Sequence, residues 1–544
     1  MRLHKILIVA NLLLAGTISV FGQSNKFSWN HLPTAELPSF KKDTFNITKY
    51  GAVSDGITLN TASINKTINA CSAKGGGVVL IPQGLWITGP IELKSNVNLH
   101  ISHSALLQFT DDKSQYNLVL GEFEGHASPR NQSPITGINL TNVAITGEGI
   151  IDGHGEVWRD IAKDRLIGAD WKKLVASGGI VSEDGKEWYP SQGYLTGLKT
   201  KNVLNMEPGK TLKDYEGVKD FLRPNMVVLN NCKKVLLQNT TFQNSPAWCL
   251  HTILCQELTV QSVHVRNEWN AHNGDAIDVE SCKDVLIEGS TFDAGDDGIC
   301  IKSGRDEDGR KRGVPTENVV VRDCIVYKSH GGFVIGSEMS GGARNIFVSN
   351  CTFIGSDIGL RFKTTRGRGG VVENIFIKNI SMKDIVHEAI LFDMYYMVKS
   401  LKKEMKPVTE ATPQFRDFYV NNVVCYGAEK GIMVRGLPEM SIKGIHLENM
   451  VLNVNKGVDL IEADNISLKN VTVNVTDTTA LVNIDNASNI VFDNFKYSHN
   501  TDLLFNIGGE KSAAIKVSHT DVTGAKKKAD FINGATESAL IIAK

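Results

Sequence analysis

Prolines, aromatic residues and excess charge are all scarce in this sequence. Only 14 of its 544 residues are proline, against 50 glycines, and aromatic residues make up 7%. With 42% hydrophobic and 22% charged residues, the composition excludes a disordered chain and a collagen-like one. The formal charge of −1 provides no overall attraction to nucleic acid or to an anionic membrane. Any recognition of a charged polymer must therefore be local.

Long apolar runs are also missing, apart from one at the start. Arg2 and Lys5 precede an apolar run from Ile6 to Val20, and small residues follow as far as Gly22. This pattern predicts a signal peptide over residues 1–22, because a membrane-spanning helix needs about 20 apolar residues. We therefore expect a secreted or periplasmic protein, soluble once the peptide is removed, with no membrane partner.

No CxxC pair occurs among the nine cysteines, so the sequence predicts no zinc site of that type and no cofactor. An odd number of cysteines in an exported protein leaves at least one thiol unpaired or in an intermolecular bond.

What the sequence does contain is a repeat. From about residue 135 onward, a turn residue, an alternating apolar run and an Asn or other polar turn recur at spacings of 21 to 43 residues. A single compact core stops growing near ~250–300 residues, whereas a repeat structure has no such limit. The first apolar residues of the repeats are Val235, Leu258, Val285, Val319, Ile346, Ile375, Phe418, Ile445, Ile466 and Ile490.

This spacing has few physical interpretations. Leucine-rich repeats would show a fixed leucine frame, which is absent, and propeller blades need ~40 residues each. Two or three short strands in each repeat fit one turn of a parallel β-helix, so we predict an all-β fold with a single solenoid of about ten or more turns. The longest spacings indicate loop insertions at 304–316 and roughly 398–414.

The cysteines repeat in the same register. Cys232, Cys255 and Cys282 each lie three residues before a repeat marker, which predicts a stacked ladder. We interpret them as small apolar residues of the stack. Disulfides between turns remain an alternative, because stacked strands lie ~4.8 Å apart.

Two segments depart from the repeat. Residues 45–100 are predicted to form an N-terminal cap with a helix from Asn60 to Ala73, because a helix can cover the unpaired strand edge of a solenoid. Residues 155–222 break the repeat and are predicted to be a long insertion packed on its side. The expected organisation is therefore one catalytic β-helix domain over residues 23–544.

Polar residues coincide when the repeats are aligned. On four consecutive turns, one side is predicted to carry Asp275, then Asp296 and Asp297, then His330, then Arg361 and Lys363. Each motif alone is weak, since Asp-Asp-Gly is a common turn and Arg-x-Lys is often a solvated strand face. Together they indicate a functional site. Clustered carboxylates repel one another and raise one another's pKa, which destabilises the folded protein and is therefore typical of active sites.

Such a cluster can supply one protonated acid and one ionised base, which cleavage of a glycosidic bond requires. Carboxyl groups ~6.5–9.5 Å apart would leave room for a water and would predict inversion of the anomeric centre. Arg361 and Lys363 suggest an acidic sugar, because arginine can clamp a carboxylate. The residues alone do not decide which aspartate is the acid.

These motifs resemble those of the polygalacturonase family of glycoside hydrolases. The matching segments are Asn273-Gly274-Asp275, Gly295-Asp296-Asp297, Ser329-His330-Gly331 and Arg361-Phe362-Lys363. The resemblance extends over most of residues 45–495. It implies a right-handed parallel β-helix that hydrolyses α-1,4-galacturonosidic bonds of polygalacturonate or pectin with inversion. The expected partner is an acidic plant cell-wall polysaccharide, and we expect the protein to be a monomer.

The resemblance also implies roles for the site residues. Asp296 would protonate the leaving oxygen, Asp275 and Asp297 would activate the water, and His330 would tune the acid. Arg361 and Lys363 would bind the uronate carboxylate. Family members also use a tyrosine beyond the Arg-x-Lys strand, and Tyr395 and Tyr396 are both candidates.

Three positions depart from the family pattern without removing a catalytic side chain: Gly274, Ser329 and Phe362. The long segments 155–222 and 304–316 resemble the extra walls of bacterial exo-acting members, so we expect cleavage from a chain end. A solvated loop rich in ion pairs is the alternative for 304–316.

Other functions are compatible with the same fold. A member of the same family could hydrolyse rhamnogalacturonan or a branched galacturonan. A pectate-lyase-like β-helix would cut by elimination, with the aspartates as Ca²⁺ ligands. A solenoid of this kind could also bind glycans without catalysis.

Overall fold

The computed structural model describes residues 27–398 and 404–543. The chain divides into two units, residues 1–32 and 33–544. In the first unit, Ser28 and His31 form an antiparallel bridge. The predicted signal peptide lies outside the described residues. Within the described ranges, no helix combines the length and the apolar character needed to cross a bilayer.

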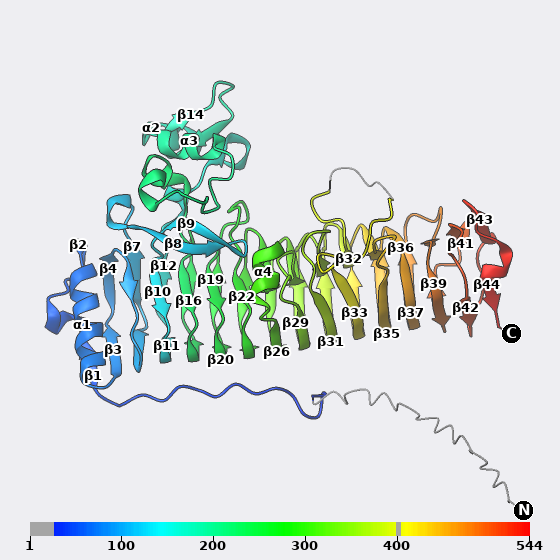
Figure 1. The fold of residues 1–544 in the computed structure, drawn as a ribbon, viewed down its shortest axis with the longest axis horizontal. Helices are drawn as coiled ribbons and strands as arrows, with labels where there is room; N and C mark the ends of the chain where they lie inside the picture. Colours follow the sequence, from blue (N-terminus) through cyan, green and yellow to red (C-terminus); the bar gives the residue numbers. More distant parts are fainter. Residues whose placement is uncertain (1–26, 399–403, 544) are drawn as a thin grey trace, which may run out of the picture. The chain divides into compact units, whose positions relative to one another are not determined.

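The second unit is a stack of parallel strands in two sheets (Figure 1). We call the smaller, 14-stranded sheet the groove sheet. Its strands are β5 (Ile91–Glu92), β10 (Ile135–Ile138), β16 (Val227–Asn230), β19 (Leu250–Ile253), β22 (Ile277–Glu280), β25 (Asp297–Lys302), β28 (Gly331–Ile335), β30 (Leu360–Lys363), β32 (Glu388–Asp393), β34 (Lys430–Arg435), β36 (Lys456–Ile461), β38 (Val482–Asp485), β41 (Leu503–Gly508) and β43 (Lys527–Ile532).

The larger sheet has 25 strands and is called the long sheet. It contains β1 (Thr44–Asn46), β2 (Asp55–Leu59), β3 (Gly77–Ile81), β4 (Gly84–Thr88), β6 (Val97–Ile101), β7 (Ala105–Phe109), β11 (Thr141–Thr146), β12 (Ile150–Asp152), β17 (Lys233–Gln238), β18 (Thr241–Gln243), β20 (Gln256–Gln261), β21 (His264–Arg266), β23 (Lys283–Glu288), β24 (Thr291–Asp293), β26 (Thr316–Arg322), β27 (Ile325–Tyr327), β29 (Ala343–Ile354), β31 (Val371–Lys383), β33 (Gln414–Tyr426), β35 (Ile442–Val454), β37 (Ala463–Val475), β39 (Ser488–Asp493), β40 (Lys496–Tyr497), β42 (Ile515–Ser518) and β44 (Leu540–Ile542).

The register of the long sheet confirms the predicted repeat. Val235 lies opposite Leu258, and every later marker lies opposite the next one, ending with Ile466 opposite Ile490. All ten markers are buried. The alternating residues of each strand therefore stack in columns inside the solenoid, which confirms the parallel β-helix.

Asparagine side chains mark the corners of the stack. Asn350 and Asn379 both adopt positive φ, at 56° and 57°, a conformation that Asn accepts more readily than most residues. The Asn379 side chain donates a hydrogen bond of 2.9 Å to the Asn350 side chain on the turn before it. The polar turns of the sequence repeat thus become a ladder between successive turns.

All nine cysteines are buried and unpaired. Within the predicted ladder, the Cys255 backbone amide donates to Cys282 Sγ at 3.3 Å. The cysteines are therefore small buried residues of the stack, as predicted. The alternative, disulfide bonds between turns, is wrong.

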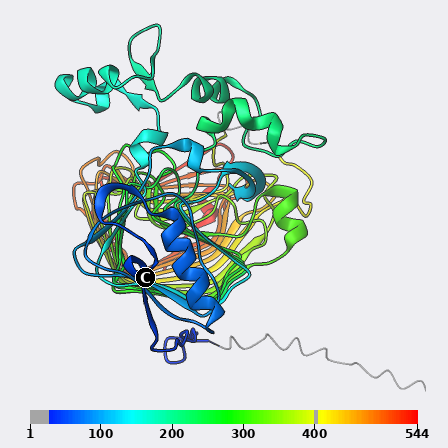
Figure 2. The ribbon, with the colours of Figure 1, turned by 90° about the vertical axis from the view of Figure 1, so that its left-hand side faces the viewer.

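Helix α1 (Thr61–Ala73) lies at the first turns, where the sequence predicted a helix over residues 60–73. Ile64, Ile68 and Cys71 are fully buried, and the helix contacts η1 (Ile47–Tyr50), β3 and β5. Figure 2, which looks along the stack from this end, shows α1 in front of the parallel strands.

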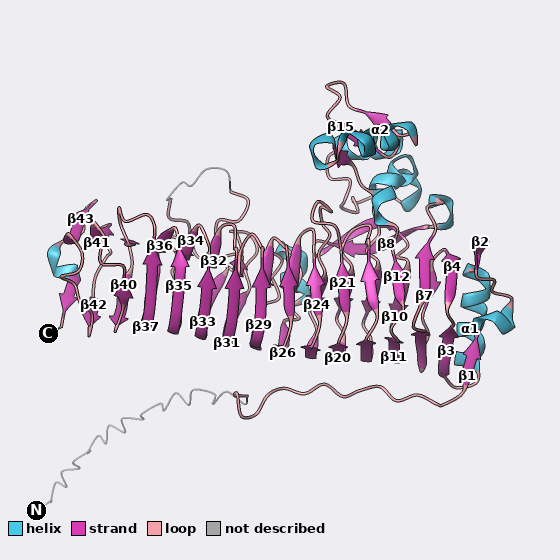
Figure 3. Ribbon diagram, turned by 180° about the vertical axis from the view of Figure 1, so that it is seen from behind, coloured by secondary structure: helices cyan, strands magenta, loops and turns pink. Residues whose placement is uncertain are grey.

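The segment between β12 and β16 leaves the stack as a small helical extension (Figures 1 and 3). It contains η3 (Gly155–Trp158), β13 (Ile161–Ala162), η4 (Lys163–Arg165), α2 (Gly168–Ala176), β14 (Ile180–Val181), β15 (Glu187–Tyr189), α3 (Gln192–Lys199) and η5 (Leu212–Phe221). An antiparallel hairpin, β8 (Leu118–Phe123) with β9 (His126–Asn131), was not predicted. The remaining helices are η2 (Lys113–Gln115), α4 (Asp306–Arg312) and η6 (Glu537–Ala539).

Candidate active site

The groove sheet brings the predicted site residues together. Asp297 begins β25 and lies opposite Gly331 on β28, so Asp296 and His330 occupy equivalent positions directly before these two strands. Cys300 lies opposite Val334, which in turn lies opposite Arg361. Strand register alone therefore places the carboxylates and cations on neighbouring turns.

Asp297 is held by two cations. Its side chain is 1% exposed; it accepts a hydrogen bond from Lys363 Nζ at 2.7 Å and one from Arg361 Nη1 at 3.1 Å. Burial alone would raise the pKa of Asp297, but the charges of Lys363 and Arg361 outweigh it and hold the pKa well below its ordinary value. Asp297 is therefore ionised, and in the free protein the two predicted sugar-binding cations are its partners.

Asp275 has the opposite environment. It is 3% exposed, and its Oδ1 has no hydrogen-bond partner among the described residues. Burial, reinforced by the negative charges of Asp278 and Asp296, raises the pKa of Asp275 well above its ordinary value, although Lys302 at 4.0 Å opposes this. One carboxylate oxygen of Asp275 lies within 4.8 Å of one carboxylate oxygen of Asp297. The site thus pairs a strongly proton-binding carboxyl with an ionised one.

Asp296 is the accessible member of the group. Its side chain is 20% exposed, and its Oδ1 lies 3.0 Å from Nδ1 of His330. The hydrogen bond to Asp296 raises the pKa of His330 above its ordinary value, while partial burial opposes the rise. The other ring nitrogen of His330 lies 3.8 Å from Asp357 Oδ2. Asp296 can therefore meet a ligand while remaining coupled to an ionisable imidazole.

Lys302 and Glu338 are functional-site residues that the sequence reasoning missed. Lys302 Nζ lies 3.2 Å from Glu338 Oε2 and 3.5 Å from Asp278 Oδ1, and 4.7 Å from the centre of the Trp248 ring. Burial would raise the pKa of Glu338, but Lys302 and Arg368 lower it to about 2. The strand period could have identified Lys302, because it follows Cys300 by two residues and so shares its face.

The structure distinguishes the two candidate tyrosines. The Tyr396 ring lies 5.0 Å from Lys363 Nζ and 5.8 Å from Arg361 Cζ, and Tyr396 lines the same cavity as the aspartates. Tyr395 is 7% exposed and faces Arg366 and Arg435 instead. Tyr396 is therefore the tyrosine of the site.

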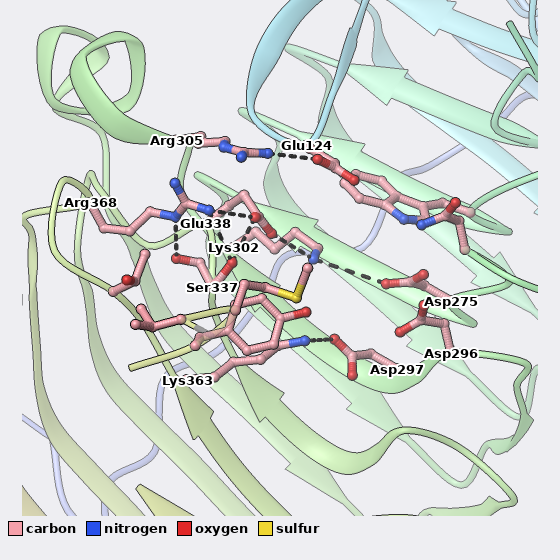
Figure 4. Close-up of a pocket in the computed structure, with 16 residues that line it drawn as sticks. Glu124, Asp275, Asp296, Asp297, Lys302, Arg305, Ser337, Glu338, Lys363 and Arg368 are labelled. Atoms are coloured by element: carbon pink, nitrogen blue, oxygen red, sulfur yellow. Dashed lines mark hydrogen bonds and ion pairs between the residues drawn. The ribbon is translucent and has the colours of Figure 1, made fainter. Parts of the chain in front are cut away.

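These residues line a cavity of about 370 Å³ (Figure 4). Its described walls carry Asp275, Asp296, Asp297, Lys302, Lys363, Glu338, Arg368, Tyr396, Glu124 and Arg305. Acidic and basic groups face each other across it, as expected of a site for a small, polar and charged ligand.

One wall is formed by an unpredicted contact that we call the clasp, between residues 122–126 of the β8–β9 hairpin and residues 304–312. Glu124 Oε2 lies 2.6 Å from Arg305 Nη1, and His126 Nδ1 lies 2.9 Å from Asp308 Oδ2. Glu122 forms an ion pair with Arg312, whose guanidinium also contacts the buried Glu280 at 2.9 Å. Loop 304–316 therefore contributes Arg305 to the cavity wall, while Glu307 and Lys311 form an exposed ion pair on its outer side.

Backbone packing reinforces the clasp. Gly125 has φ +74°, and a Cβ atom there would lie 2.5 Å from the Arg305 backbone nitrogen. The hairpin tip thus lies directly against the backbone of the loop, which only a glycine permits.

The aspartate cluster is a poor match for the calcium site of a lyase. The group that could contact one ion consists of Asp275, Asp297 and Cys300, and a thiol is not among the oxygen ligands that Ca²⁺ prefers. Asp297 already has two cationic partners.

Residues 162–424 match the profile of the family described as Glycosyl hydrolases family 28, and this segment contains all six predicted site residues. The chain is a glycoside hydrolase, and it is similar to the members of this family. It is 26% identical over 428 residues to a probable polygalacturonase of Vitis vinifera, covering 76% of this chain and 75% of the relative. It is 28% identical over 388 residues to an exo-poly-alpha-D-galacturonosidase of Dickeya chrysanthemi, covering 70% of this chain but only 61% of the relative.

Solved structures of polygalacturonases share the fold of this glycoside hydrolase. An exopolygalacturonase from Thermotoga maritima is 29% identical, with a TM-score of 0.65 over 85% of this chain and 94% of that one. A family 28 exopolygalacturonase from Yersinia enterocolitica, at 22% identity and a TM-score of 0.64 over 80% of this chain and 75% of that one, shows the shared fold. The fold is thus the predicted right-handed parallel β-helix.

Proposed function

We propose that this enzyme hydrolyses α-1,4-galacturonosidic bonds of polygalacturonate from a chain end, with inversion at the anomeric carbon. The observation that carries the proposal is the contrast among three neighbouring carboxyl groups. Asp297 is buried and ionised, Asp275 is buried with a raised pKa, and Asp296 is accessible and bonded to His330. The names of the relatives from Dickeya and Thermotoga support the substrate and the chain-end mode.

In the proposed mechanism, Asp296 donates its proton to the oxygen of the leaving sugar as the glycosidic C–O bond breaks. Asp297 accepts a hydrogen bond from the attacking water and orients it. The water oxygen bonds to the anomeric carbon, and its proton passes to the ionised Asp297, while Asp275, which keeps its own proton, hydrogen-bonds the water and holds it in place. His330 lies at hydrogen-bond distance from Asp296, a contact that raises the pKa of the imidazole, and it holds the acid in position.

The cations recognise the acidic sugar. Arg361 and Lys363 point their donors at Asp297 in the free enzyme, and a bound uronate offers them a second carboxylate. Tyr396 lies beside both cations and supplies a ring against which the sugar packs.

The clasp supports the chain-end mode. Glu124 and Arg305 both line the catalytic cavity, and their ion pair joins the hairpin to segment 304–312 at the cavity wall. In the proposed function this wall closes one end of the cavity. A polymer threading through the groove would need that end open, whereas a terminal sugar needs only the other end.

The test is digestion of polygalacturonate, with rhamnogalacturonan in parallel, and with products sized over time and their anomeric form followed by NMR. The proposal expects galacturonate or one short product from the first minutes and an inverted anomer. Mixed oligomers would refute the chain-end mode, retention would refute the mechanism, and an unsaturated product absorbing in the ultraviolet would indicate a lyase. Faster cleavage of rhamnogalacturonan would show that rhamnogalacturonan, and not polygalacturonate, is the substrate.

Residues 1–22 support the further proposal that the enzyme is exported before it acts. Fractionation of expressing cells, with N-terminal sequencing of the exported form, would test this. Material retaining residues 1–22 in the cytoplasm would contradict it.

A further inference from the structure

A second hollow lies on the other side of the Asp296–His330 pair. Its volume is about 620 Å³, and His330 and Gly295 form the wall next to the catalytic acid. Asp296 itself lines the catalytic cavity, and its Oδ1 lies 3.0 Å from His330 Nδ1. The two hollows therefore meet at the group proposed to protonate the leaving sugar.

The far wall of this hollow presents an exposed aromatic ring. Trp269, on the loop between β21 and β22, is 53% exposed although it is a large apolar side chain. The Arg165 guanidinium lies 4.5 Å from the centre of the ring, and Arg165 belongs to η4 of the insertion. An exposed tryptophan ring leaves a large apolar surface in contact with water unless a ligand covers it. The ring can stack on a sugar, and the neighbouring guanidinium can bind the carboxylate of that sugar.

The loop that carries Trp269 is fixed from the insertion. His272 Nε2 lies 2.6 Å from Asp160 Oδ1. Arg223, after the insertion, donates to the His272 carbonyl at 2.9 Å and to Asn273 Oδ1 at 2.8 Å. Because the same loop ends at Asp275, the insertion positions the aromatic platform and one catalytic carboxylate together.

The charges of the hollow favour an acid. Arg165 and Lys328 contribute two cations, and the imidazoles of His272 and His330 also face it. Asp357 is the carboxylate on its described wall, and it lies 3.8 Å from His330 Nε2. The two cations outnumber the one carboxylate, so the charge of these lining residues is positive even when both imidazoles are neutral.

We propose that this hollow is a binding subsite for galacturonate units on the leaving side of the scissile bond, built from Trp269, Arg165 and Lys328. The proposal rests on the proposed function, because the clasp closes the catalytic cavity around the terminal sugar and leaves this hollow for the rest of the chain. The first leaving unit lies beside Asp296 and His330; Trp269 stacks on the pyranose face of the second leaving unit, and Arg165 binds the carboxylate of that unit or the next. A dimer therefore does not reach Trp269. The insertion then sets a preference for longer substrates.

The test compares kcat/KM for galacturonate oligomers of two to six units in the wild type, Trp269→Ala and Arg165→Ala. We expect Trp269→Ala to retain the wild-type rate on the dimer within twofold and to lose about two- to tenfold on longer oligomers. Tyr426→Ala is the matched control, because Tyr426 is an aromatic residue 67% exposed on the long sheet. Its length profile should equal that of the wild type.

The same experiment distinguishes failure of the proposed subsite from failure of the proposed galacturonan hydrolysis. If the wild type cleaves no galacturonan of any length, the proposed function fails. If the wild type cleaves them and Trp269→Ala follows it at every length, the subsite is wrong. An equal loss at all lengths, dimer included, would mean that Trp269 only supports the Asp275 loop, and would also overturn the subsite.

Charge recognition has its own readout. Methyl esterification removes the carboxylate that Arg165 is proposed to bind. The wild type should therefore prefer free oligomers to their methyl esters more strongly than Arg165→Ala does, and Arg165→Lys should recover part of the preference. An unchanged preference in Arg165→Ala would refute the role of the arginine.

Discussion

The pairing of Lys363 with Asp297 leads to a quantitative prediction about stability. Lys363 Nζ donates to Asp297 at 2.7 Å, and both side chains are at most 5% exposed. Lys363→Met keeps most of the apolar volume and removes the charge. Asp297 would then keep its ion pair with Arg361, at 3.1 Å, and the more distant charge of Lys302.

Removal of one member of a buried ion pair costs about 3–5 kcal/mol, because the other charge stays buried without compensation. Since Arg361 remains, we expect Lys363→Met to lower the free energy of unfolding by about 3 kcal/mol at pH 7. The loss depends on pH. A carboxylate whose pKa is depressed in the folded state contributes stability above its unfolded pKa of about 3.9, and this contribution disappears as the pH falls through the folded value.

The assay is urea unfolding of the wild type, Lys363→Met and the double variant Lys363→Met/Asp297→Asn, at pH 7 and at about pH 2.5, which lies between the unfolded and the folded pKa of Asp297. The difference between the wild type and Lys363→Met should shrink at the lower pH, and the double variant should recover part of the stability at pH 7. Equal losses at both pH values, or a double variant less stable than the single one, would refute the assigned pairing.

Three further predictions concern the site and the core. Asp296→Asn should lower kcat on polygalacturonate by about 10²–10⁴-fold with an unchanged circular dichroism spectrum, whereas a nearly unchanged kcat would remove Asp296 as the acid. Because His330 has a raised folded pKa, its stabilisation is present below pH ~6.5 and is lost as the pH rises through the folded value. The melting-temperature advantage of the wild type over His330→Gln should accordingly fall between pH 5.5 and 8, and a constant advantage would contradict the Asp296 contact. All nine thiols are buried, so a thiol reagent should label none of them rapidly in the native protein and all nine in denaturant, and fast native labelling would show an exposed thiol.

The sequence was sufficient for the features that depend on local periodicity. Strand alternation and Asn turns repeat with every turn of the solenoid, so residue spacing alone aligns Val235 with Leu258, and Arg361 with the column of Cys300. The same periodicity brings Asp275, Asp297 and His330 onto neighbouring turns.

Features that depend on long-range contacts between irregular loops could not be predicted. The Glu124–Arg305 ion pair joins residues 181 positions apart, and neither flanking segment has a repeat that would align them. For the same reason, Tyr396 could not be chosen over Tyr395, since the two neighbours differ only in the direction in which the chain turns after β32.

The clasp also connects turns of the solenoid that are not direct neighbours. The hairpin leaves the stack before β10 and meets a loop that follows β25, so it bridges five successive strands of the groove sheet: β10, β16, β19, β22 and β25. Turns of a solenoid contact only their neighbours, so fraying that starts at the last turn can advance one turn at a time. Because the clasp connects several turns, we expect these turns to unfold together as one cooperative unit. Amide exchange should then be graded towards β43 and uniform within the braced block, where Asp275 and Asp297 are held.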